Sequence, residues 1–444
     1  MNATMGNESQ VFGLEPEKGR WFFVVLGMII NLCLGTVYAW SVFRKPLAAH
    51  FSTETVKVTA TDTLWPFMLF LGLFAVLMPV GGKLVQRGVA PRTITIVGSA
   101  IVALGWFLSG HVSSLNMVYL TYGVIGGIGV GLAYGIPIAV STRWFPDKKG
   151  LAVGFTVLGF GLSALITAPL ANYLITTPDA IPNFIGVACD LATENSPSNC
   201  VMPTFSILGI AFLIITFICA LPLRFPAAGW QPAGWKAGGA GGIVAADITG
   251  SALLGTSTFY GLWFCFFVGS LSGLMAIGIA SPVGQEIIKL DAATAATLVS
   301  VFALFNGGGR PIFGWLTDAL TPRYSAALTC GIILLASLAM YKFAGEGNVL
   351  LYTVCFCGFW MCLGGWLAIA PTSTATFFGL KNYAFNYSIV FPAYSAGAII
   401  GGLVSGFAKD VYGSYINAFL VTAVLGAIGL IVALTLVKPV KTAS

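Results

Sequence analysis

The segment that decides the fold is Ala292–Leu316, which reads AATAATLVSVFALFNGGGRPIFGWL. As a helix it is long enough to cross a hydrocarbon core of about 30 Å, and Arg310 is its only ionisable residue. A guanidinium keeps its proton even when it is removed from water, so its burial requires a partner or a cavity. No acidic residue lies at membrane depth in the other hydrophobic segments, so we expect the partner to be a bound anion. The alternative is an arginine that snorkels to the membrane surface or holds helix-end carbonyl groups.

The composition is that of an integral membrane protein. Of the 444 residues, 57% are hydrophobic and 8% are charged, whereas soluble domains average about 25% charged residues. This excludes a soluble fold and predicts an all-α membrane protein with twelve transmembrane helices. Residues 1–20 lack the pattern of a cleaved signal peptide. The expected spans are 21–43, 64–85, 93–110, 115–141, 151–175, 203–224, 255–281, 292–316, 324–345, 348–377, 383–408 and 414–437.

Lys and Arg are distributed unevenly between the two sides that these spans create. The side that holds both termini receives 14 of them and the opposite side receives 6, which together with Arg310 makes the 21 in the chain. Cytoplasmic loops of membrane proteins are enriched in Lys and Arg. The sequence therefore predicts a cell-membrane protein with both termini in the cytoplasm. The net charge of +6 follows from this topology and implies no nucleic-acid partner.

A glycine-rich stretch divides the spans into two sets of six. It contains GGAGG at 238–242 and is typical of a flexible linker. The predicted organisation is a cytoplasmic N-terminus (1–20), a first half (21–224), a cytoplasmic linker (225–254), a second half (255–437) and a cytoplasmic tail (438–444).

The two halves repeat a loop motif between their second and third spans. In the first half GKLVQ at 82–86 leads to Arg92, and in the second half GWLTD at 314–318 leads to Arg323. Parallel repeats in a twelve-span protein are typical of secondary transporters whose halves rock about a central site. The residues that we expect to act in cytoplasmic gating are Gly82, Arg92, Gly314, Asp318 and Arg323.

These loops resemble the G-x-L-x-D motif of the major facilitator superfamily. RWFPDKKG at 143–150, NGGGRP at 306–311 and Asn386-Tyr387 are together similar to the oxalate/formate antiporter family, which is related to the monocarboxylate transporters. The resemblance runs from Arg20 to Val437. It implies two six-helix halves that transport small organic anions by alternating access. Gln86 stands where the first-half motif has an aspartate, so the second-half copy is expected to be the better formed.

Asn306 lies four residues before Arg310, so the two residues share one face of a helix. Its amide can hydrogen-bond one oxygen of a carboxylate while the guanidinium binds the charge. The glycines at 307–309 leave room beside this pair. That room serves either a ligand or, alternatively, the close packing of another helix.

The resemblance assigns the carboxylate anchor to Arg310 and adds Tyr38 and Tyr134 as residues that orient the substrate. A tyrosine hydroxyl on a rigid apolar ring can donate to a small anion in a dry cavity. The alternative is that each tyrosine is a core aromatic residue bonded to a backbone carbonyl. Further cavity positions implied by the resemblance are Phe160, Leu363, Leu367 and Phe391.

Tyr394 bears on the choice of substrate. The type member of the resembled family uses a second intramembrane cation, a lysine, to hold the other carboxylate of oxalate, and Tyr394 occupies that position here. One fixed charge balances one carboxylate, and a second carboxylate would stay unbalanced at a high cost in a buried site. We therefore expect formate, acetate, lactate or pyruvate as the substrate. An oxalate/formate exchanger and a carboxylate sensor that does not transport are the alternatives.

The coupling mechanism is open at the level of sequence. Monocarboxylate transporters carry an aspartate at the position of Asn306, which cannot titrate. Glu286 and Asp291, the nearest titratable groups, are expected to be solvated loop charges. Anion exchange and proton symport are therefore both compatible with the residues.

The remaining chemistry of the chain is sparse. With two histidines and no nucleophile–base or metal-ligand set, we expect neither an enzyme nor a cofactor or metal site, and a monomer in the lipid bilayer. Cys189 and Cys200 lie in a polar loop between spans. They are candidates for a disulfide if that compartment is oxidising.

Overall fold

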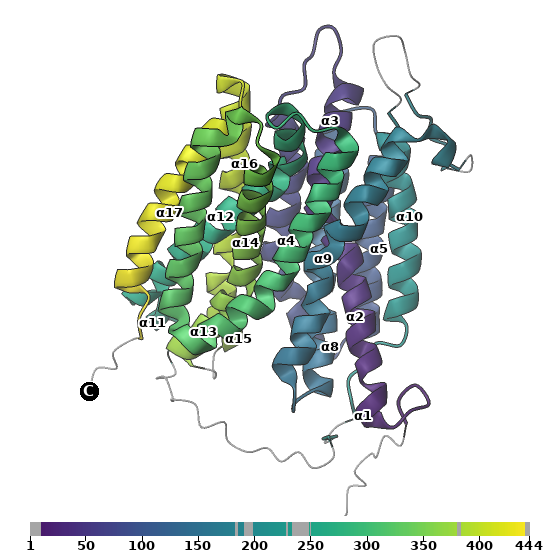
Figure 1. Ribbon diagram of the computed structural model, residues 1–444. Coiled ribbons are helices and arrows are strands. Elements are labelled where there is room, and N and C mark those ends of the chain that lie inside the picture. The colour runs from purple at the N-terminus through teal and green to yellow at the C-terminus, as the bar shows by residue number, and fades with distance from the viewer. Residues whose placement is uncertain are drawn as a thin grey trace, which may run out of the picture.

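The fold, seen in the computed structural model of Figure 1, is a bundle of long helices that run side by side. The structure describes residues 10–182, 185–190, 199–227, 230–232, 248, 250–379 and 383–439. These residues form helices and two isolated β-bridges, with no strand among them. Most of the predicted linker, residues 1–9 and residues 440–444 lie outside the described residues.

The helices fall into two consecutive groups along the chain. In the first part they are α1 (Pro16–Gly19), α2 (Trp21–Leu34), α3 (Trp40–Phe51), α4 (Trp65–Gln86), α5 (Pro91–Ser109), α6 (Leu115–Val118), α7 (Gly127–Ala133), α8 (Gly135–Trp144), α9 (Lys149–Thr176) and α10 (Val201–Ala220). In the second part they are α11 (Gly250–Leu253), α12 (Ser257–Glu286), α13 (Ala292–Phe343), α14 (Val349–Phe378), α15 (Tyr383–Val390), α16 (Pro392–Tyr412) and α17 (Ile416–Leu436).

All twelve expected spans fall on these helices. Ten helical stretches among the described residues are long and apolar enough to cross a membrane. One of them contains α13, whose 52 residues include two expected spans and reverse at Thr321, where φ is +77°. Pro322 follows this residue and disfavours a helical conformation before it. The eleventh expected span is divided between α15 and α16, with Pro392 at the start of α16.

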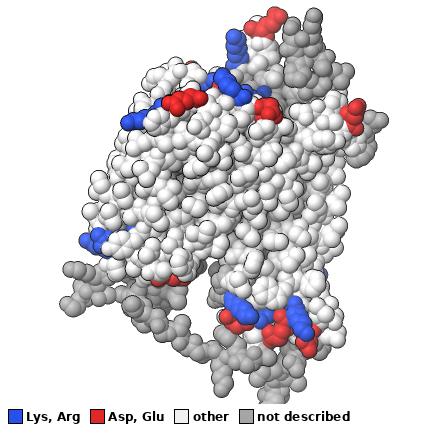
Figure 2. Space-filling model, viewed as in Figure 1, with Lys and Arg blue, Asp and Glu red and all other residues white. Residues whose placement is uncertain are grey.

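On the face shown in Figure 2, charged side chains lie at the two ends of the bundle. Figure 2 shows basic and acidic residues at both ends and a broad uncharged band between them, as expected for a protein that spans a bilayer. We call the end that carries α1 and the end of α17 the terminal side (Figure 1). The opposite end, which carries residues 52–61 and the bridge between Asp190 and Asn199, is called the loop side.

The two groups of helices meet along two seams. The first half contributes α9 to one seam, where it packs on α13, and α4 to the other, where it packs on α16. Within the second half, α13 and α14 touch backbone to backbone, because a Cβ atom at Gly364 would overlap the carbonyl oxygen of Asn306. Gly309 stands equally close to the carbonyl of Met361. Small residues at helix contacts permit this approach in membranes, and here they fix Arg310 and Asn306 against α14.

Candidate functional site

Arg310 lies at the seam between the two halves, on α13. Its side chain is buried, with 5% of the residue exposed. One guanidinium nitrogen donates to the backbone carbonyl of Val157 on α9, and the other lies 3.5 Å from Oδ1 of Asn306. The Nε atom is buried without a hydrogen-bond partner. No carboxylate among the described residues forms an ion pair with Arg310, so its positive charge is met only by neutral oxygens.

Asn306 is held in one orientation by its own helix pair. Its Nδ2 atom donates to the carbonyl of Trp360 at 3.2 Å, which turns Oδ1 toward Arg310. This assignment of the amide follows from the hydrogen-bond network. The indole N–H of Trp360 is itself buried without an acceptor. Trp360 therefore adds a possible donor to the site that the sequence analysis did not identify, because an isolated tryptophan in an apolar helix carries no signal of such a role.

A cavity of about 560 Å³ begins at Arg310 and extends between α9, α13 and α14 toward their terminal-side ends. Leu367, one of the expected cavity residues, lines it together with Val157 and Pro311. Its walls are otherwise mainly apolar, with Phe155 and Trp315 among them. An apolar cavity with one guanidinium is suited to a small anion that carries an apolar group, since a few polar contacts then fix its orientation.

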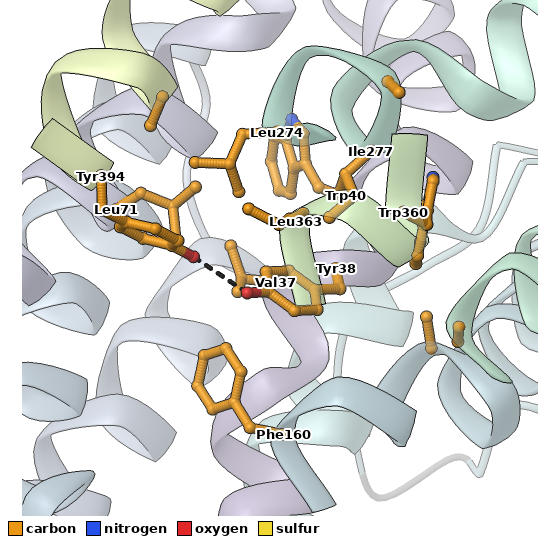
Figure 3. Packing of buried hydrophobic residues seen from close by; sticks show 14 of the residues in the cluster. Val37, Tyr38, Trp40, Leu71, Phe160, Leu274, Ile277, Trp360, Leu363 and Tyr394 are labelled. Atoms are coloured by element: carbon orange, nitrogen blue, oxygen red, sulfur yellow. Dashed lines mark hydrogen bonds between the residues drawn. The ribbon is translucent and has the colours of Figure 1, made fainter. Parts of the chain in front are cut away.

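A pair of tyrosines from opposite halves closes the centre of the molecule. The hydroxyl groups of Tyr38 and Tyr394 are 2.9 Å apart, and Figure 3 shows them pointing toward each other above the ring of Phe160. The Phe160 ring contacts Tyr38 edge-on at 5.1 Å. Leu363 is buried beside the same group of residues (Figure 3). No local pattern pairs these two residues, which lie 356 positions apart, although both were expected at the site.

Tyr134 completes this aromatic group on the first half. Its ring contacts Phe160 at 5.1 Å and Phe74 at 5.0 Å, both edge-on. The tyrosine lies close enough to interact electrostatically with Arg310. Phe391 stacks on Tyr394 at 5.4 Å. All nine expected substrate residues thus lie around one region. The ring of Phe74, which sequence analysis missed, contacts the rings of both Tyr134 and Tyr394.

The expected gating residues do not form one cluster. Gly82 has open space around its Cα, and Arg92 is exposed and lines a separate cavity. Gly314 lines the Arg310 cavity, whereas Asp318 is exposed. Arg323 donates to the carbonyl of Leu434, and no ion pair joins it to Asp318 in the described part of the chain.

A partly buried ion pair on the terminal side involves other residues. Arg20 binds both carboxylate oxygens of Asp147, at 2.6 and 2.8 Å, and also donates to the carbonyl of Trp144. These hydrogen bonds hold the pKa of Asp147 below its usual range. The pair ties the start of α2 to the loop after α8, both within the first half. Asp147 belongs to the RWFPDKKG motif, which was recognised in the sequence, but its pairing with Arg20 was not predicted.

The loop side carries polar contacts that cross from one half to the other. Arg44 is 2% exposed and donates to Thr63 Oγ1, to the carbonyl of Ala60 and to the carbonyl of Gly278 in the second half. Asp410, in the second half, accepts hydrogen bonds from the backbone N–H groups of Ala60 and Thr61. We call these contacts the loop-side latch, together with the bridge of Glu286 described next.

Glu286 corrects one expectation. It was expected to be a solvated loop charge, but it lies at the end of α12 and bridges Lys45 of the first half, at 3.6 Å, and Lys409 of the second half, at 2.7 Å. Its carboxylate is 26% exposed. The reason is that α3 continues past the apolar run to Phe51 and carries Lys45 to this seam. Asp291 is exposed and caps α13 by accepting from the N–H of Thr294 at 2.9 Å.

Cys189 and Cys200 are joined by a disulfide in the structure. The bond closes the loop-side segment between α9 and α10. His50, near the end of α3, lies 2.7 Å from Asp190, the residue after Cys189. The crosslinked segment is therefore also tied to the first span.

Comparison with known proteins identifies the family. The sequence model of the Major Facilitator Superfamily matches residues 20–376 and 262–444. The chain is 30% identical to the oxalate:formate antiporter of Oxalobacter formigenes over 95% of its own length and 93% of that protein. It is 24% identical to monocarboxylate transporter 13 of Rattus norvegicus, over 92% and 87% of the two chains.

A solved structure has the same fold. It is a bacterial homolog of the human lysosomal transporter Spinster in an inward-facing and unoccupied conformation. It aligns with a TM-score of 0.70 at 15% identity and covers 94% of this chain and 96% of its own. The chain therefore belongs to the major facilitator superfamily of membrane transporters, in the group that contains the oxalate:formate antiporter.

Proposed function

We propose that this transporter carries a small monocarboxylate, with formate, acetate, lactate and pyruvate as the candidate substrates. The observation that carries the proposal is the state of Arg310: a buried guanidinium with an unpartnered Nε atom, no ion pair among the described residues, and a cavity of about 560 Å³ beside it. A carboxylate can accept two parallel N–H bonds from such a group. Asn306 and Tyr134 are then positioned to orient the bound anion.

The preference for one carboxylate rests on a count of charges. Tyr394, at the position where the resembled exchanger has a lysine, is neutral and hydrogen-bonded to Tyr38. Arg310 is the one cation among the nine substrate residues, so a dianion in this site would leave one negative charge buried without compensation. The relatives that are monocarboxylate transporters agree with this preference.

We further propose that transport proceeds by exchange of anions. The groups around Arg310 are an amide, a backbone carbonyl and tyrosines, none of which exchanges a proton readily near neutral pH. An empty site would have to carry an uncompensated charge through the conformational change. The loop-side latch and the cavity that extends toward the terminal side support a cycle in which the two sides open alternately. Gly82, Arg92, Gly314, Asp318 and Arg323 are proposed to act on the terminal side of that cycle.

The membrane orientation is part of the proposal. The excess of Lys and Arg on the terminal side favours an orientation with that side, and both termini, in the cytoplasm, in the membrane at the cell surface. The protein is proposed to act as a monomer. We propose that residues 21–224 and 255–437 form its two halves and that residues 225–254 are the linker between them.

Counterflow in proteoliposomes tests the substrate class. Vesicles loaded with formate, acetate, lactate, pyruvate or oxalate in turn are diluted into the labelled form of the same anion. We expect accumulation with at least one monocarboxylate and little with oxalate. Oxalate exchange as fast as the best monocarboxylate would contradict the charge count, and binding of a carboxylate without any flux would favour a sensor. Uptake driven by a pH gradient into vesicles without internal anion would favour proton symport.

Substitution of Tyr394 tests the same argument from the other direction. Tyr394→Lys adds a second cation to the site, so the preference is expected to shift toward oxalate. Tyr394→Phe is the matched control, because it removes the hydroxyl bond to Tyr38 without adding charge. If both variants lose monocarboxylate exchange equally and neither gains oxalate exchange, the residue does not set the charge preference.

A further inference from the structure

A second cavity lies far from Arg310, at the terminal-side ends of α5 and α10. Its volume is about 510 Å³. Arg92, at the start of α5, and Arg224, just after α10, both line it, and none of the described residues that line it is acidic. The rest of its lining is apolar and includes Phe12 and Leu221. Such a cavity has the composition of a site for an anion that carries an apolar part.

A third guanidinium stands next to this cavity. Arg143 lies over the ring of Phe225, 3.7 Å from its centroid, and Phe225 lines the cavity. Trp144, the residue after Arg143, donates its indole N–H to the backbone carbonyl of Arg224. The backbone of the segment that carries Arg224 is thus held in place by α8, and the guanidinium of Arg143 is held over the ring of Phe225.

An exposed apolar stripe on α10 leads into the same cavity. Its residues follow the spacing of one helical face, and each is between 42% and 60% exposed. Leu221 ends the stripe and lines the cavity. In a membrane-spanning helix such a face lies against acyl chains. The stripe consists of Leu213, Ile214, Phe217, Ile218 and Leu221.

We propose that this cavity binds the headgroup of an anionic phospholipid, whose acyl chains lie along the stripe on α10. Arginine side chains bind phosphate oxygens through parallel N–H bonds, and basic pockets between transmembrane helices are typical headgroup sites. The continuity of the stripe with the cavity favours a lipid over a free anion, because a free anion would leave the apolar approach unused. This site is independent of the proposed substrate and of Arg310.

Lipid titration of the purified full-length protein tests the proposal. The protein in detergent receives phosphatidylglycerol, phosphatidylcholine or inorganic phosphate, and bound lipid is counted by native mass spectrometry while the melting temperature is followed. We expect retention of phosphatidylglycerol and a higher melting temperature with it, because a ligand of the folded state stabilises that state. Equal retention of the two lipids, or equal protection by phosphate alone, would overturn the proposal.

Charge substitutions assign the binding to the cavity. The double variant Arg92→Gln with Arg224→Gln is expected to bind phosphatidylglycerol about tenfold or more weakly. Lys83→Gln with Arg87→Gln is the matched control, since both residues are exposed on the same side and neither lines the cavity. An equal effect of the two double variants would show that general surface charge, and not this cavity, attracts the lipid.

Leu221→Asp provides a second variant that keeps all arginines. It places a carboxylate where the stripe enters the cavity, at an exposed position where folding tolerates change. It should reduce retention of phosphatidylglycerol to the level of phosphatidylcholine. Unchanged retention in a folded Leu221→Asp variant would contradict the site even if the double variant failed to fold.

Discussion

Two buried arginines, Arg44 and Arg310, meet very different surroundings in this molecule. Each nitrogen of the Arg44 guanidinium has an acceptor, at 2.8 to 3.1 Å, and Tyr415 lies beneath it with its ring centroid at 5.6 Å. Arg310 has an unpartnered Nε atom and a bond of 3.5 Å to Asn306. Only Arg310 adjoins the cavity of about 560 Å³ between α9, α13 and α14. A buried cation whose hydrogen bonds are all made stabilises the structure, whereas one with an unpartnered nitrogen is a candidate for binding a ligand.

Replacing each arginine by glutamine is the direct test of this difference, and Arg310→Gln has the largest expected effect. Exchange of the best substrate should fall about 100-fold or more, because the variant loses the charge that binds the carboxylate. The melting temperature without substrate should stay the same or rise, since a poorly partnered charge is removed from the interior. Uptake and thermal unfolding of the same preparation measure both effects. If Arg310→Gln instead unfolded at a lower temperature and its folded fraction exchanged substrate at the wild-type rate, Arg310 would be a structural residue and the comparison with Arg44 would be wrong.

Arg44→Gln is expected to behave in the opposite way. It breaks three hydrogen bonds from a charged donor, each of which is worth about 1.5–3 kcal/mol, and one of them joins the two halves. The melting temperature should fall clearly, while carboxylate binding to the remaining folded protein should persist. Thermal unfolding and a substrate-induced shift in melting temperature give the two readouts. Loss of binding without loss of stability would place Arg44 in the substrate path.

The ion pair between Arg20 and Asp147 lies within the first half, so its contribution to stability can be compared with that of the loop-side latch, which joins the two halves. Asp147→Asn should destabilise the protein by about 1–3 kcal/mol. Because the pKa of Asp147 is lowered in the folded state, its contribution is present above the ordinary Asp pKa of about 4 and is lost as pH falls through the folded pKa. Melting curves from pH 7 down to pH 3 should converge for the wild type and Asp147→Asn. Parallel curves over that range would show that the carboxylate does not stabilise the fold.

The smallest effect is expected at the bridge of Glu286, where the two lysines form a matched pair. Lys45→Gln breaks the contact between halves and Lys409→Gln breaks the contact within one half. Partly exposed ion pairs contribute about 0–1 kcal/mol and are screened by salt, so stability should hardly change. Lys45→Gln should nevertheless increase the labelling of a cysteine introduced at Ser281, which is buried near the loop-side end of α12, more at low salt than at high salt. Equal labelling in Lys45→Gln and Lys409→Gln would show that the Glu286 bridge does not help to hold the two halves together on the loop side.

The fold and one part of the site could be predicted because they depend on local pattern. Runs of apolar residues marked the helices, and the four-residue spacing of Asn306 and Arg310 placed them in contact. The break at Thr321 inside α13 falls between two expected spans, and Pro322 after it disfavours a continuous helix. The apolar run of the first span ends at Phe43, but its helix continues to Phe51. Polarity marks the edge of the membrane and not the end of a helix, so the sequence does not show that Arg44 is buried between the two halves.

The rest of the site depends on contacts between distant segments. The Tyr38–Tyr394 bond joins the two halves and could be anticipated only through family resemblance. The sequence did not identify the carbonyl of Val157 or the ring of Phe74 as part of the site. Every residue has a backbone carbonyl, and an apolar aromatic residue is as common in a protein core as in a binding site. The partner of Asp147 was equally hidden, since it lies 127 residues away.

The close fit of Gly364 and Gly309 between α13 and α14 has a mechanical consequence for Arg310. Because α13 and α14 have no room to slide past each other, Arg310 is expected to move together with the second half as one rigid body. Its hydrogen bond to the Val157 carbonyl on α9 joins this body to the first half. Under the proposed function, a carboxylate bound to Arg310 would take the place of this hydrogen bond and balance the charge of the guanidinium. The hydrogen bond between the halves would then be broken only when substrate is bound, which is what exchange requires.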